Sequence, residues 1–211
     1  MDITPVRRTL ALGAAVLSLA ACGAEPRAEP QPFHGVLVTP PQGKPEFTFT
    51  TTSGTPYPLR EETAGKVTLL FFGYTHCPDV CPLHMANIAA VLRTLSFEER
   101  QQIHVLFVTT DPERDTPERL RGWLANFDPS FVGLAGPLDQ VNHLQRSIGL
   151  APAMQEPAPE GSPAGAYGVA HSAVVLAFTP DDSLRVLYPF GTRQQDWAAD
   201  LPALIRYGRR R

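Results

Sequence analysis

Two cysteines four positions apart, Cys77 and Cys81, have the residue type and spacing best suited to chemistry in this sequence. They lie where an apolar stretch gives way to a proline that suits a helix start. If the first helical turn is already wound at Cys77, their β-carbons lie about 5–6 Å apart on one face. Two sulfurs at that spacing can hold one metal ion or, after modest backbone movement, form a disulfide. A helix N-terminus also stabilises the thiolate, the form that binds metals and attacks disulfides.

A passive role for the same pair is the alternative. The two cysteines could be ordinary buried residues, or a structural disulfide that closes a very small ring. Such a ring removes little entropy from the unfolded chain, and reactive thiols favour helix starts. The pattern therefore favours reactive cysteines.

The elements that position this pair begin with residues 67–72, a nearly unbroken apolar run typical of a strand buried on both faces. A helix is expected from Pro82, because apolar residues then recur at spacings of three and four. Residues 103–108 indicate a second buried strand. Thr116 as N-cap and Pro117 in the first turn then predict the next helix.

The rest of the chain indicates an opening hairpin, a further strand and helix, an irregular loop, a late hairpin and a closing helix. These are expected at residues 47–59, 131–134, 138–148, 151–166, 173–190 and 197–205. The order of elements predicts an α/β fold, a three-layer sandwich around a central mixed sheet with an inserted strand-helix unit.

The N-terminal segment predicts export. Arg7 and Arg8 precede a short apolar run that ends in Leu-Ala-Ala-Cys at residues 19–22, as in a lipoprotein signal. The run is too short to span a bilayer as a helix. An ordinary cleaved signal is the alternative, and the paired arginines leave Sec and twin-arginine export both open. Three segments are expected: a signal peptide over residues 1–21, a Pro-rich tether over 22–45 that is lipidated at Cys22, and a globular domain over 46–208.

Composition narrows the range of functions. The 211 residues carry 18 basic and 21 acidic side chains, and a net charge of -3 disfavours a nucleic-acid binder. A hydrophobic content of 43% is enough for one globular domain and argues against a disordered chain. Three cysteines are too few for a disulfide-dense secreted scaffold, so each cysteine needs its own explanation.

Three segments taken together resemble the Sco/SenC family of copper-binding, thioredoxin-like proteins. They are FFGYTHCPDVCP at residues 71–82, TTDPERDTP at 109–117 and YGVAHS at 167–172. The resemblance covers most of residues 45–207. It implies a thioredoxin-like fold and a copper site in which Cys77 and Cys81 are the sulfur ligands and His171 is the histidine ligand.

The donor set that the resemblance implies is chemically consistent with copper. Two thiolates and one imidazole form a soft site that suits Cu(I), and Cu(II) once further nitrogen or oxygen donors are added. Zinc could also occupy such a set. Many family members have Asp immediately before the histidine, whereas this chain has Ala170, a departure that bears on the tuning of the site more than on its existence.

Four neighbouring residues are weaker candidates. We expect His76 to lie outside the site, facing solvent or packed on the strand. Asp79 either modulates the thiols or partner docking, or is simply a turn residue. Asp111 equally suits a place beside the metal ligands or a turn and helix-start role. Met154 is a soft donor in the loop before His171, but a single methionine in such a loop is usually incidental.

By resemblance, the protein is expected to be a copper chaperone, lipid-anchored to a membrane on its extracytoplasmic side. It would deliver copper to the CuA centre of cytochrome c oxidase, or reduce the cysteines of that centre. The expected partners are the CuA-bearing subunit or another copper chaperone, and the membrane through the anchor.

The main rival is a thiol–disulfide oxidoreductase that uses Cys77 and Cys81 without copper, although the usual C-x-x-C spacing is absent. A peroxidase of the peroxiredoxin type fits less well, because Thr75 stands two residues before Cys77 rather than three. Either rival would make His171 dispensable.

Overall fold

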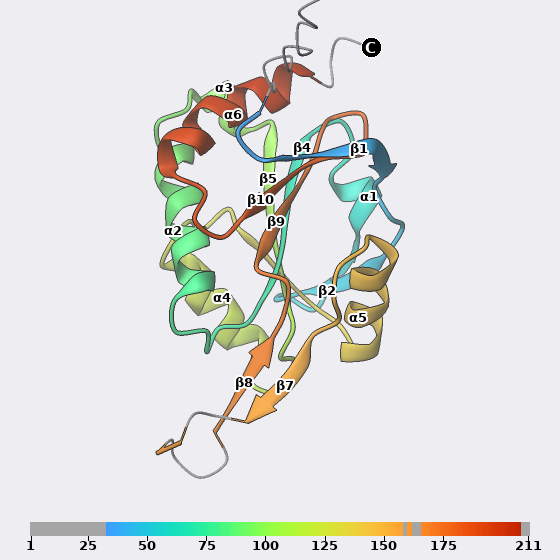
Figure 1. Ribbon diagram of the computed structural model, residues 1–211, viewed down its shortest axis with the longest axis vertical. Coiled ribbons are helices and arrows are strands. Elements are labelled where there is room, and N and C mark those ends of the chain that lie inside the picture. The colour runs from blue at the N-terminus through green and yellow to red at the C-terminus, as the bar shows by residue number, and fades with distance from the viewer. Residues whose placement is uncertain (1–32, 158–159, 162–165, 208–211) are drawn as a thin grey trace, which may run out of the picture. The chain divides into compact units, whose positions relative to one another are not determined.

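The computed structural model describes residues 33–157, 160–161 and 166–207. A mixed eight-stranded sheet in the order β1-β10-β9-β4-β5-β6-β2-β3 lies at its centre (Figure 1). The strands of this sheet are β1 Val36–Gly43, β2 Thr48–Thr51, β3 Pro56–Pro58, β4 Val67–Gly73, β5 Ile103–Thr109, β6 Val132–Ala135, β9 Val174–Phe178 and β10 Ser183–Pro189. A separate pair consists of β7 Met154–Pro157 and β8 Tyr167–Ala170. The helices are α1 Leu59–Glu62, α2 Val80–Leu92, α3 Phe97–Arg100, α4 Pro117–Ala125, α5 Leu138–Ser147 and α6 Gln194–Tyr207.

Strand β4 lies in the interior of the sheet, as its apolar sequence predicts. All seven of its residues are buried. It pairs in parallel with β5 on one side and antiparallel with β9 on the other. The expected late hairpin is β9 and β10, and the expected opening hairpin is β2 and β3.

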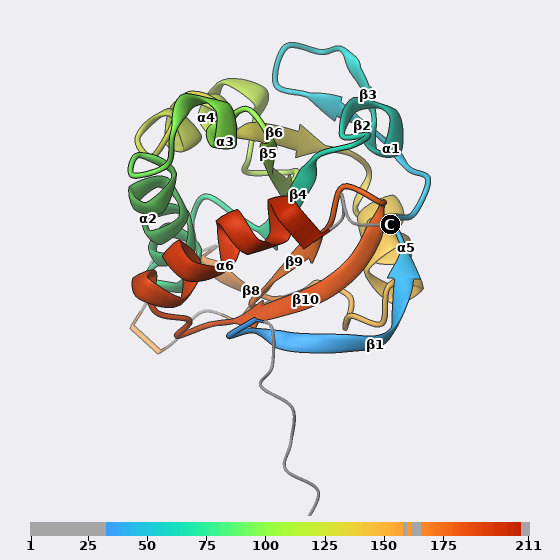
Figure 2. The same ribbon diagram turned by 90° about the horizontal axis from the view of Figure 1, so that it is seen from above.

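The sheet separates two apolar cores. Leu69 and Phe71 of β4 point into one core, which α2, α4 and α6 cover. Leu70 and Phe72 point into the other, which α1 and α5 cover. Figure 2 shows these two groups of helices on opposite faces of the sheet. The predicted three-layer α/β sandwich is thereby confirmed.

Helix starts agree with the sequence in one case and differ in another. The side chain of Thr116 caps α4, and Pro117 is its first residue, as expected. Helix α2 instead begins at Val80, with Asp79 as its N-cap. Pro82 is tolerated inside the first turn, where backbone N–H groups have no partner within the helix. The helix therefore starts two residues before the expected Pro82, and the condition that the first helical turn already includes Cys77 is not met.

The C-terminal part of the expected tether is a strand. Strand β1 pairs antiparallel with β10, so residues 36–43 belong to the sheet rather than to a linker. The strand lies at the edge of the sheet and its register is interrupted between Leu37 and Gln42. Proline is accepted at such an edge because one side of the strand needs no ladder bonds, and Pro40 and Pro41 fall within the interruption.

The expected irregular loop at residues 151–166 also contains a strand. Residues of β7 pair antiparallel with β8, and this two-stranded arm extends below the sandwich in Figure 1. All four residues of β7 are exposed. Its sequence therefore shows no alternation of apolar and polar residues, which is why the pattern did not predict it.

Part of the expected N-terminal organisation lies outside the described residues. This applies to the signal peptide at residues 1–21, to Cys22 and to the first part of the tether. Within the ranges that the structure describes, no helix has the length and apolarity needed to cross a bilayer.

Candidate metal centre

Cys77, Cys81 and His171 meet just beyond the carboxyl-terminal end of β4. Their two sulfurs and one imidazole nitrogen all lie within 4.8 Å of one another. The Sγ atom of Cys81 is 3.7 Å from Nε2 of His171, although 90 residues separate them in the sequence. The structure thus brings together the three residues that the sequence predicted as metal ligands.

Cys77 reaches this position through a turn rather than through the helix. Its backbone N–H donates to the carbonyl oxygen of Tyr74 at 3.2 Å. The backbone N–H of Cys81, in the first turn of α2, donates to Sγ of Cys77 at 3.4 Å. Cys77 is 8% exposed and Cys81 is fully buried, and both thiols are free. The N-terminus of α2 therefore faces the Cys77 sulfur, as thiolate stabilisation requires.

Gly73, the last residue of β4, leaves the room that Cys81 occupies. A Cβ atom at this position would lie 2.9 Å from Sγ of Cys81 and 2.7 Å from the ring of Phe71. Real Cβ atoms do not approach other atoms that closely, so any larger residue would displace the sulfur or the ring. The glycine before the cysteine loop is thus a steric requirement of the site.

The two thiols have pKa values displaced in opposite directions. A hydrogen bond from the Cys81 thiol lowers the pKa of Cys77, with further help from His171 and from the backbone N–H groups of Cys81 and Asp79. The same hydrogen bond, together with burial, raises the pKa of Cys81. In the metal-free protein one proton is therefore shared by the pair, with Cys77 as the thiolate.

His171 is held by aromatic rings and by its own backbone. Its ring meets the ring of Tyr74 edge-on at 5.7 Å and that of Phe71 at 5.9 Å. Its Nδ1 lies 3.3 Å from the carbonyl oxygen of Ser172. A proton on Nδ1 directed to this carbonyl leaves Nε2 unprotonated toward Cys81, which is the tautomer that a metal needs.

The loop before Cys77 is fixed by Asp115, which is 2% exposed. The carboxylate accepts hydrogen bonds from the backbone N–H and hydroxyl of Thr75 and from the hydroxyl of Thr109. Arg119 donates to the same Thr75 hydroxyl at 2.7 Å. The TTDPERDTP motif therefore supports the cysteine loop from the end of the neighbouring strand β5.

His76 lies outside the three-residue cluster, as expected. It belongs to a second group with Asp111 and Asp115, whose donor atoms also lie within 4.8 Å of one another. Asp115 already accepts the threonine donors just described, and Asp111 forms an ion pair with Arg114 at 2.5 Å. Because both carboxylates have protein partners, this second group is built as a hydrogen-bond network.

The remaining candidates have other positions. Asp79 is the N-cap of α2 and accepts from the backbone of Val80. Met154 is 61% exposed, and it pairs with Ala170 across the β7–β8 arm. Cys22 lies outside the described residues.

Two aromatic residues at the site were not singled out from the sequence. Tyr74 contacts His171 as described above. His84, one turn after Cys81 on α2, is 3% exposed, and its ring packs on Phe71 and Phe190 at 5.1 and 5.9 Å. Burial lowers the pKa of His84, and its Nε2 has no hydrogen-bond partner among the described residues. The sequence signal that could have identified His84 was its position three residues after Cys81.

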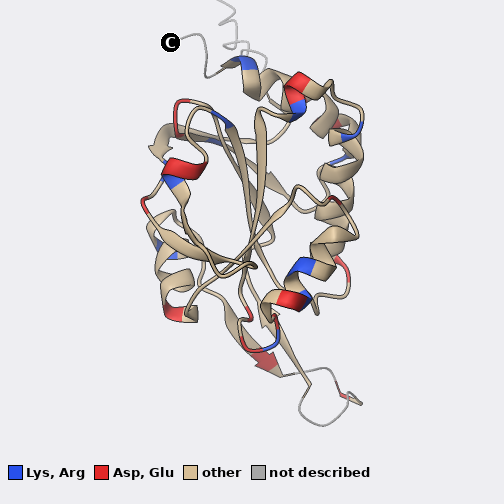
Figure 3. Cartoon of the chain, turned by 180° about the vertical axis from the view of Figure 1, so that it is seen from behind, with Lys and Arg blue, Asp and Glu red and all other residues tan. Residues whose placement is uncertain are grey.

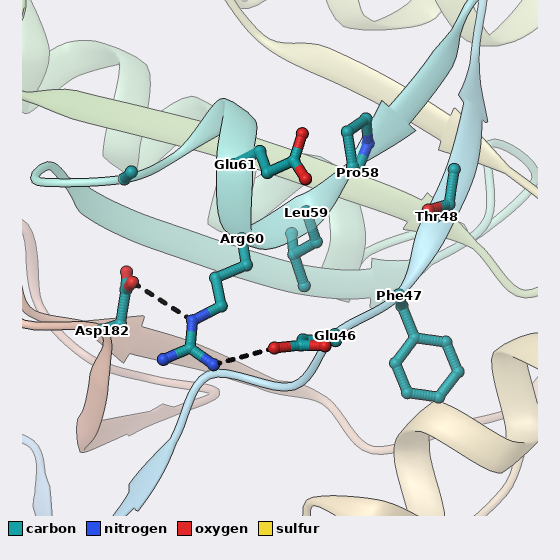
Figure 4. A pocket seen from close by; sticks show the side chains of 9 residues that line it. Glu46, Phe47, Thr48, Pro58, Leu59, Arg60, Glu61 and Asp182 are labelled. Atoms are coloured by element: carbon teal, nitrogen blue, oxygen red, sulfur yellow. Dashed lines mark hydrogen bonds and ion pairs between the residues drawn. The ribbon is translucent and has the colours of Figure 1, made fainter.

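A cavity lined by both charged and apolar residues lies near the amino-terminal end of β4. It has a volume of about 500 Å³ and lies between α1, the start of β2 and the β9–β10 turn (Figure 4). Arg60 lies in it, 3.2 Å from Glu46 and 3.5 Å from Asp182. None of the predicted ligands lines this cavity.

Known proteins resemble this chain in sequence. The SCO1/SenC family model matches residues 38–206. A putative copper-binding protein of Stutzerimonas stutzeri is 36% identical over 129 residues, which are 61% of this chain and 61% of that protein. The mitochondrial SCO1 homolog of Homo sapiens is 29% identical over 169 residues, 78% of this chain and 54% of that protein. The matched segment therefore spans less than two thirds of either relative.

Solved structures share the fold. ScoI of Bradyrhizobium japonicum with copper bound is 30% identical, with a TM-score of 0.66 over 78% of this chain and 100% of that one. Apo Sco1 of Thermus thermophilus is 31% identical, with a TM-score of 0.70 over 82% of this chain and 97% of that one. With a family match over most of its length and this shared architecture, the chain belongs to the SCO1/SenC family.

Proposed function

We propose that this protein is an exported copper-binding metallochaperone that serves the CuA centre of cytochrome c oxidase. The observation that carries the proposal is the meeting of two cysteine sulfurs and one histidine nitrogen within 4.8 Å. Relatives named for copper, and a solved family member with copper bound, support copper as the cargo.

The donor set fits copper on chemical grounds. Thiolates select soft ions, and a site with two sulfurs and one imidazole suits Cu(I). Cys77 and Cys81 would supply the sulfurs and His171 its Nε2. His171 is half-buried, so the cluster is open to solvent on that side. Such an opening lets an acceptor approach the metal without unfolding the donor.

The oxidation state of the cysteine pair would control loading. Both thiols are free in the structure, and Cys77 has the lowered pKa that a metal ligand requires. Oxidation of the Cys77 thiolate and the Cys81 thiol to a disulfide passes two electrons to an external oxidant, releases the one proton of the pair and leaves no thiolate for the metal. The protein would therefore carry copper only while Cys77 and Cys81 are reduced.

Reduction of a partner's disulfide is the second candidate function. The lowered pKa of Cys77 and the short distance between the two sulfurs favour it. The Cys77 thiolate would attack the partner disulfide, forming a mixed disulfide and releasing one partner thiol. Cys81 would then displace the second partner thiol, so that two electrons pass to the partner and a Cys77–Cys81 disulfide remains.

The N-terminal segments complete the proposal. Residues 1–21 would be removed as a signal peptide, and Cys22 would carry the lipid that anchors the protein on the extracytoplasmic side. The tether would be shorter than residues 22–45, because β1 starts at Val36. Intact mass of the membrane-extracted protein tests this: a lipidated Cys22 as the first residue is expected, and an unmodified Cys22 would contradict it.

A copper competition titration tests the site. The reduced protein is titrated with Cu(I) against a chelator, together with Cys77→Ser and His171→Ala. Tight one-to-one binding that weakens at least tenfold in each variant is expected. Met154→Ala is the matched control, because it removes an exposed soft donor outside the cluster and should bind copper like the wild type. Binding indifferent to His171→Ala would contradict the three-residue site.

Transfer experiments separate the two candidate functions. The copper-loaded protein is mixed with a CuA-bearing domain in its reduced, metal-free form, and the reduced metal-free protein is mixed with the same domain in its oxidised, metal-free form. Loss of partner disulfide reduction in Cys77→Ser but not in His171→Ala would identify reduction as a separate activity. A chaperone instead requires His171 for copper to appear in the partner.

A further inference from the structure

The strand that brings His171 to the site is not part of the central sheet. Among the residues that the structure describes, strand β8 pairs only with β7, and all four residues of β7 are exposed. His171 and the two residues that connect it to β9 are only half-buried. Pairing with an exposed strand does not fix the distance between His171 and the cysteines. Other contacts must hold β8 against the body of the domain.

Arg114, in the loop after β5, supplies such a contact. Its guanidinium lies 3.5 Å from the centre of the Tyr167 ring, at the start of β8. Its Nη1 donates to the carbonyl oxygen of Tyr167 at 3.0 Å, and its Nε donates to Asp111. The hydroxyl of Tyr167 donates to the same carboxylate at 2.8 Å. We refer to Arg114, Asp111 and Tyr167 as the arginine clasp.

The clasp leads directly to His171. The Arg114 guanidinium is also 5.9 Å from the ring of Tyr74, and this ring meets the His171 ring edge-on. A backbone hydrogen bond joins the Tyr74 hydroxyl to Val169, in the middle of β8. Strand β8 is thus held at its first residue by the clasp and two residues later by Tyr74, and Tyr74 also accepts the hydrogen bond from Cys77.

We propose that Arg114 is a positioning residue of the metal centre, which sets the place of His171 relative to Cys77 and Cys81 through its clasp on Tyr167. Arginine is needed because one planar group stacks on the ring and bonds two oxygens at once, which lysine cannot do. The test that measures Cu(I) affinity rests on the proposed function. The test that measures the placement of His171 in the metal-free protein does not.

The first test uses the copper-free protein. The His171 ring meets the Tyr74 and Phe71 rings edge-on, so ring currents are expected to shift its proton resonances. In Arg114→Gln these resonances should move toward the values of a histidine in an unstructured peptide. Arg185→Gln is the matched control, because Arg185 also bonds an aspartate, Asp181, and lies 5.3 Å from a tyrosine ring, away from the site. The control should leave the His171 resonances unchanged.

The second test is a double-mutant cycle on Cu(I) affinity. Arg114→Gln should weaken binding about 10–100-fold, the usual effect of losing a group that orients a metal ligand. In a His171→Ala background the same substitution should have no further effect, because the residue it positions is already absent. Tyr167→Phe keeps the ring and loses only its bond to Asp111, so it should shift both readouts in the same direction by less. This mild variant keeps the test valid if Arg114→Gln folds poorly.

Three results would overturn the proposal. One is unchanged His171 resonances in Arg114→Gln. Another is an equal loss of affinity in both backgrounds, which would mean that Arg114 acts on the cysteines or on the fold as a whole. The third is full recovery by Arg114→Lys, which would mean that charge alone matters. If the wild type binds copper without needing His171, the proposed copper site fails, and the resonances still decide the role of Arg114.

Discussion

Strand β4 has a buried polar cluster at each end, and the two clusters are built in opposite ways. At its amino-terminal end the ammonium of Lys44, whose side chain is fully buried, donates to Thr63, Thr68 and Asp182. At its carboxyl-terminal end the donor atoms of the metal centre converge within 4.8 Å of one another, and Sγ of Cys81 is 3.7 Å from Nε2 of His171. The Lys44 cluster uses every ammonium proton in a hydrogen bond, whereas the metal centre leaves lone pairs of its ligand atoms directed at a shared point.

This difference separates structural from functional polar groups. A buried charge with all of its donors satisfied holds segments together and has nothing left to offer a ligand. Convergent soft donors with long mutual contacts gain most from an ion between them. Figure 3 also shows charged residues, drawn red and blue, in the loop at the base of the β7–β8 arm, the region of the arginine clasp.

The largest contrast is expected from copper itself. Saturating Cu(I) at about 1,000 times the dissociation constant should stabilise the wild type by about 4 kcal/mol, because copper binds only the folded site. Cys81→Ser should lose nearly all of this gain, whereas Lys44→Met should keep it. Chemical denaturation with and without copper measures both. Equal copper stabilisation of the wild type and Cys81→Ser would erase the distinction between the two ends.

Lys44→Met should destabilise the copper-free protein by about 3 kcal/mol. It leaves Asp182 without its buried partner, and the 20% exposure of that carboxylate and its contact with Arg60 keep the cost at the low end of the usual range. Urea denaturation of the copper-free protein measures it. Cys77→Ser is the comparison and should cost clearly less, so a reversed order would contradict the structural role of Lys44.

Two glycines, Gly65 just before β4 and Gly73 at its last position, sharpen the comparison. Gly73→Ala should destabilise by about 2 kcal/mol and weaken copper binding, because its new methyl group would collide with the Cys81 sulfur. Gly65→Ala has open space around it but a φ of +70°, so it should cost about 1 kcal/mol of backbone strain and leave copper affinity unchanged. Parallel unfolding and copper titrations test the pair, and weaker copper binding in Gly65→Ala would argue against a local steric effect.

The smallest effect is expected at an exposed polar contact. His34 lies 2.7 Å from Asp200, and the hydrogen bond and negative charge of Asp200 raise the pKa of this histidine. Because the folded-state pKa is raised, the stabilisation is fully present below about pH 6.5, the unfolded value, and is lost as the pH rises through the folded value. The difference in Tm between wild type and His34→Gln should therefore be larger at about pH 5.5 than at about pH 9. An equal difference at both values would show that the contact does not depend on the proton.

Much of the fold could be predicted because its central elements carry strong local signals. The apolar run of β4 and the Thr116 cap of α4 needed no tertiary information. Strands β1 and β7 were missed for the opposite reason. Both are largely exposed and form because a partner strand is present, so their residues show no alternation.

The three ligand residues of the site were predicted from the sequence, whereas the residues that hold them in position were not. The spacing of Cys77 and Cys81 by itself indicates a reactive or metal-binding pair, whereas His171 was assigned as a ligand through the family resemblance. Tyr74 contacts His171, which is 97 residues away, and Arg114 contacts Tyr167, which is 53 residues away. No local pattern in the sequence marks such contacts.

X-ray absorption at the copper edge tests the three-residue site most directly. The reduced protein is loaded with one equivalent of Cu(I), alongside His171→Ala loaded in the same way. Two sulfur neighbours and one histidine nitrogen are expected in the wild type, with the nitrogen lost in the variant. A wild-type spectrum explained by sulfur alone, or identical spectra for the two proteins, would contradict a site built from Cys77, Cys81 and His171.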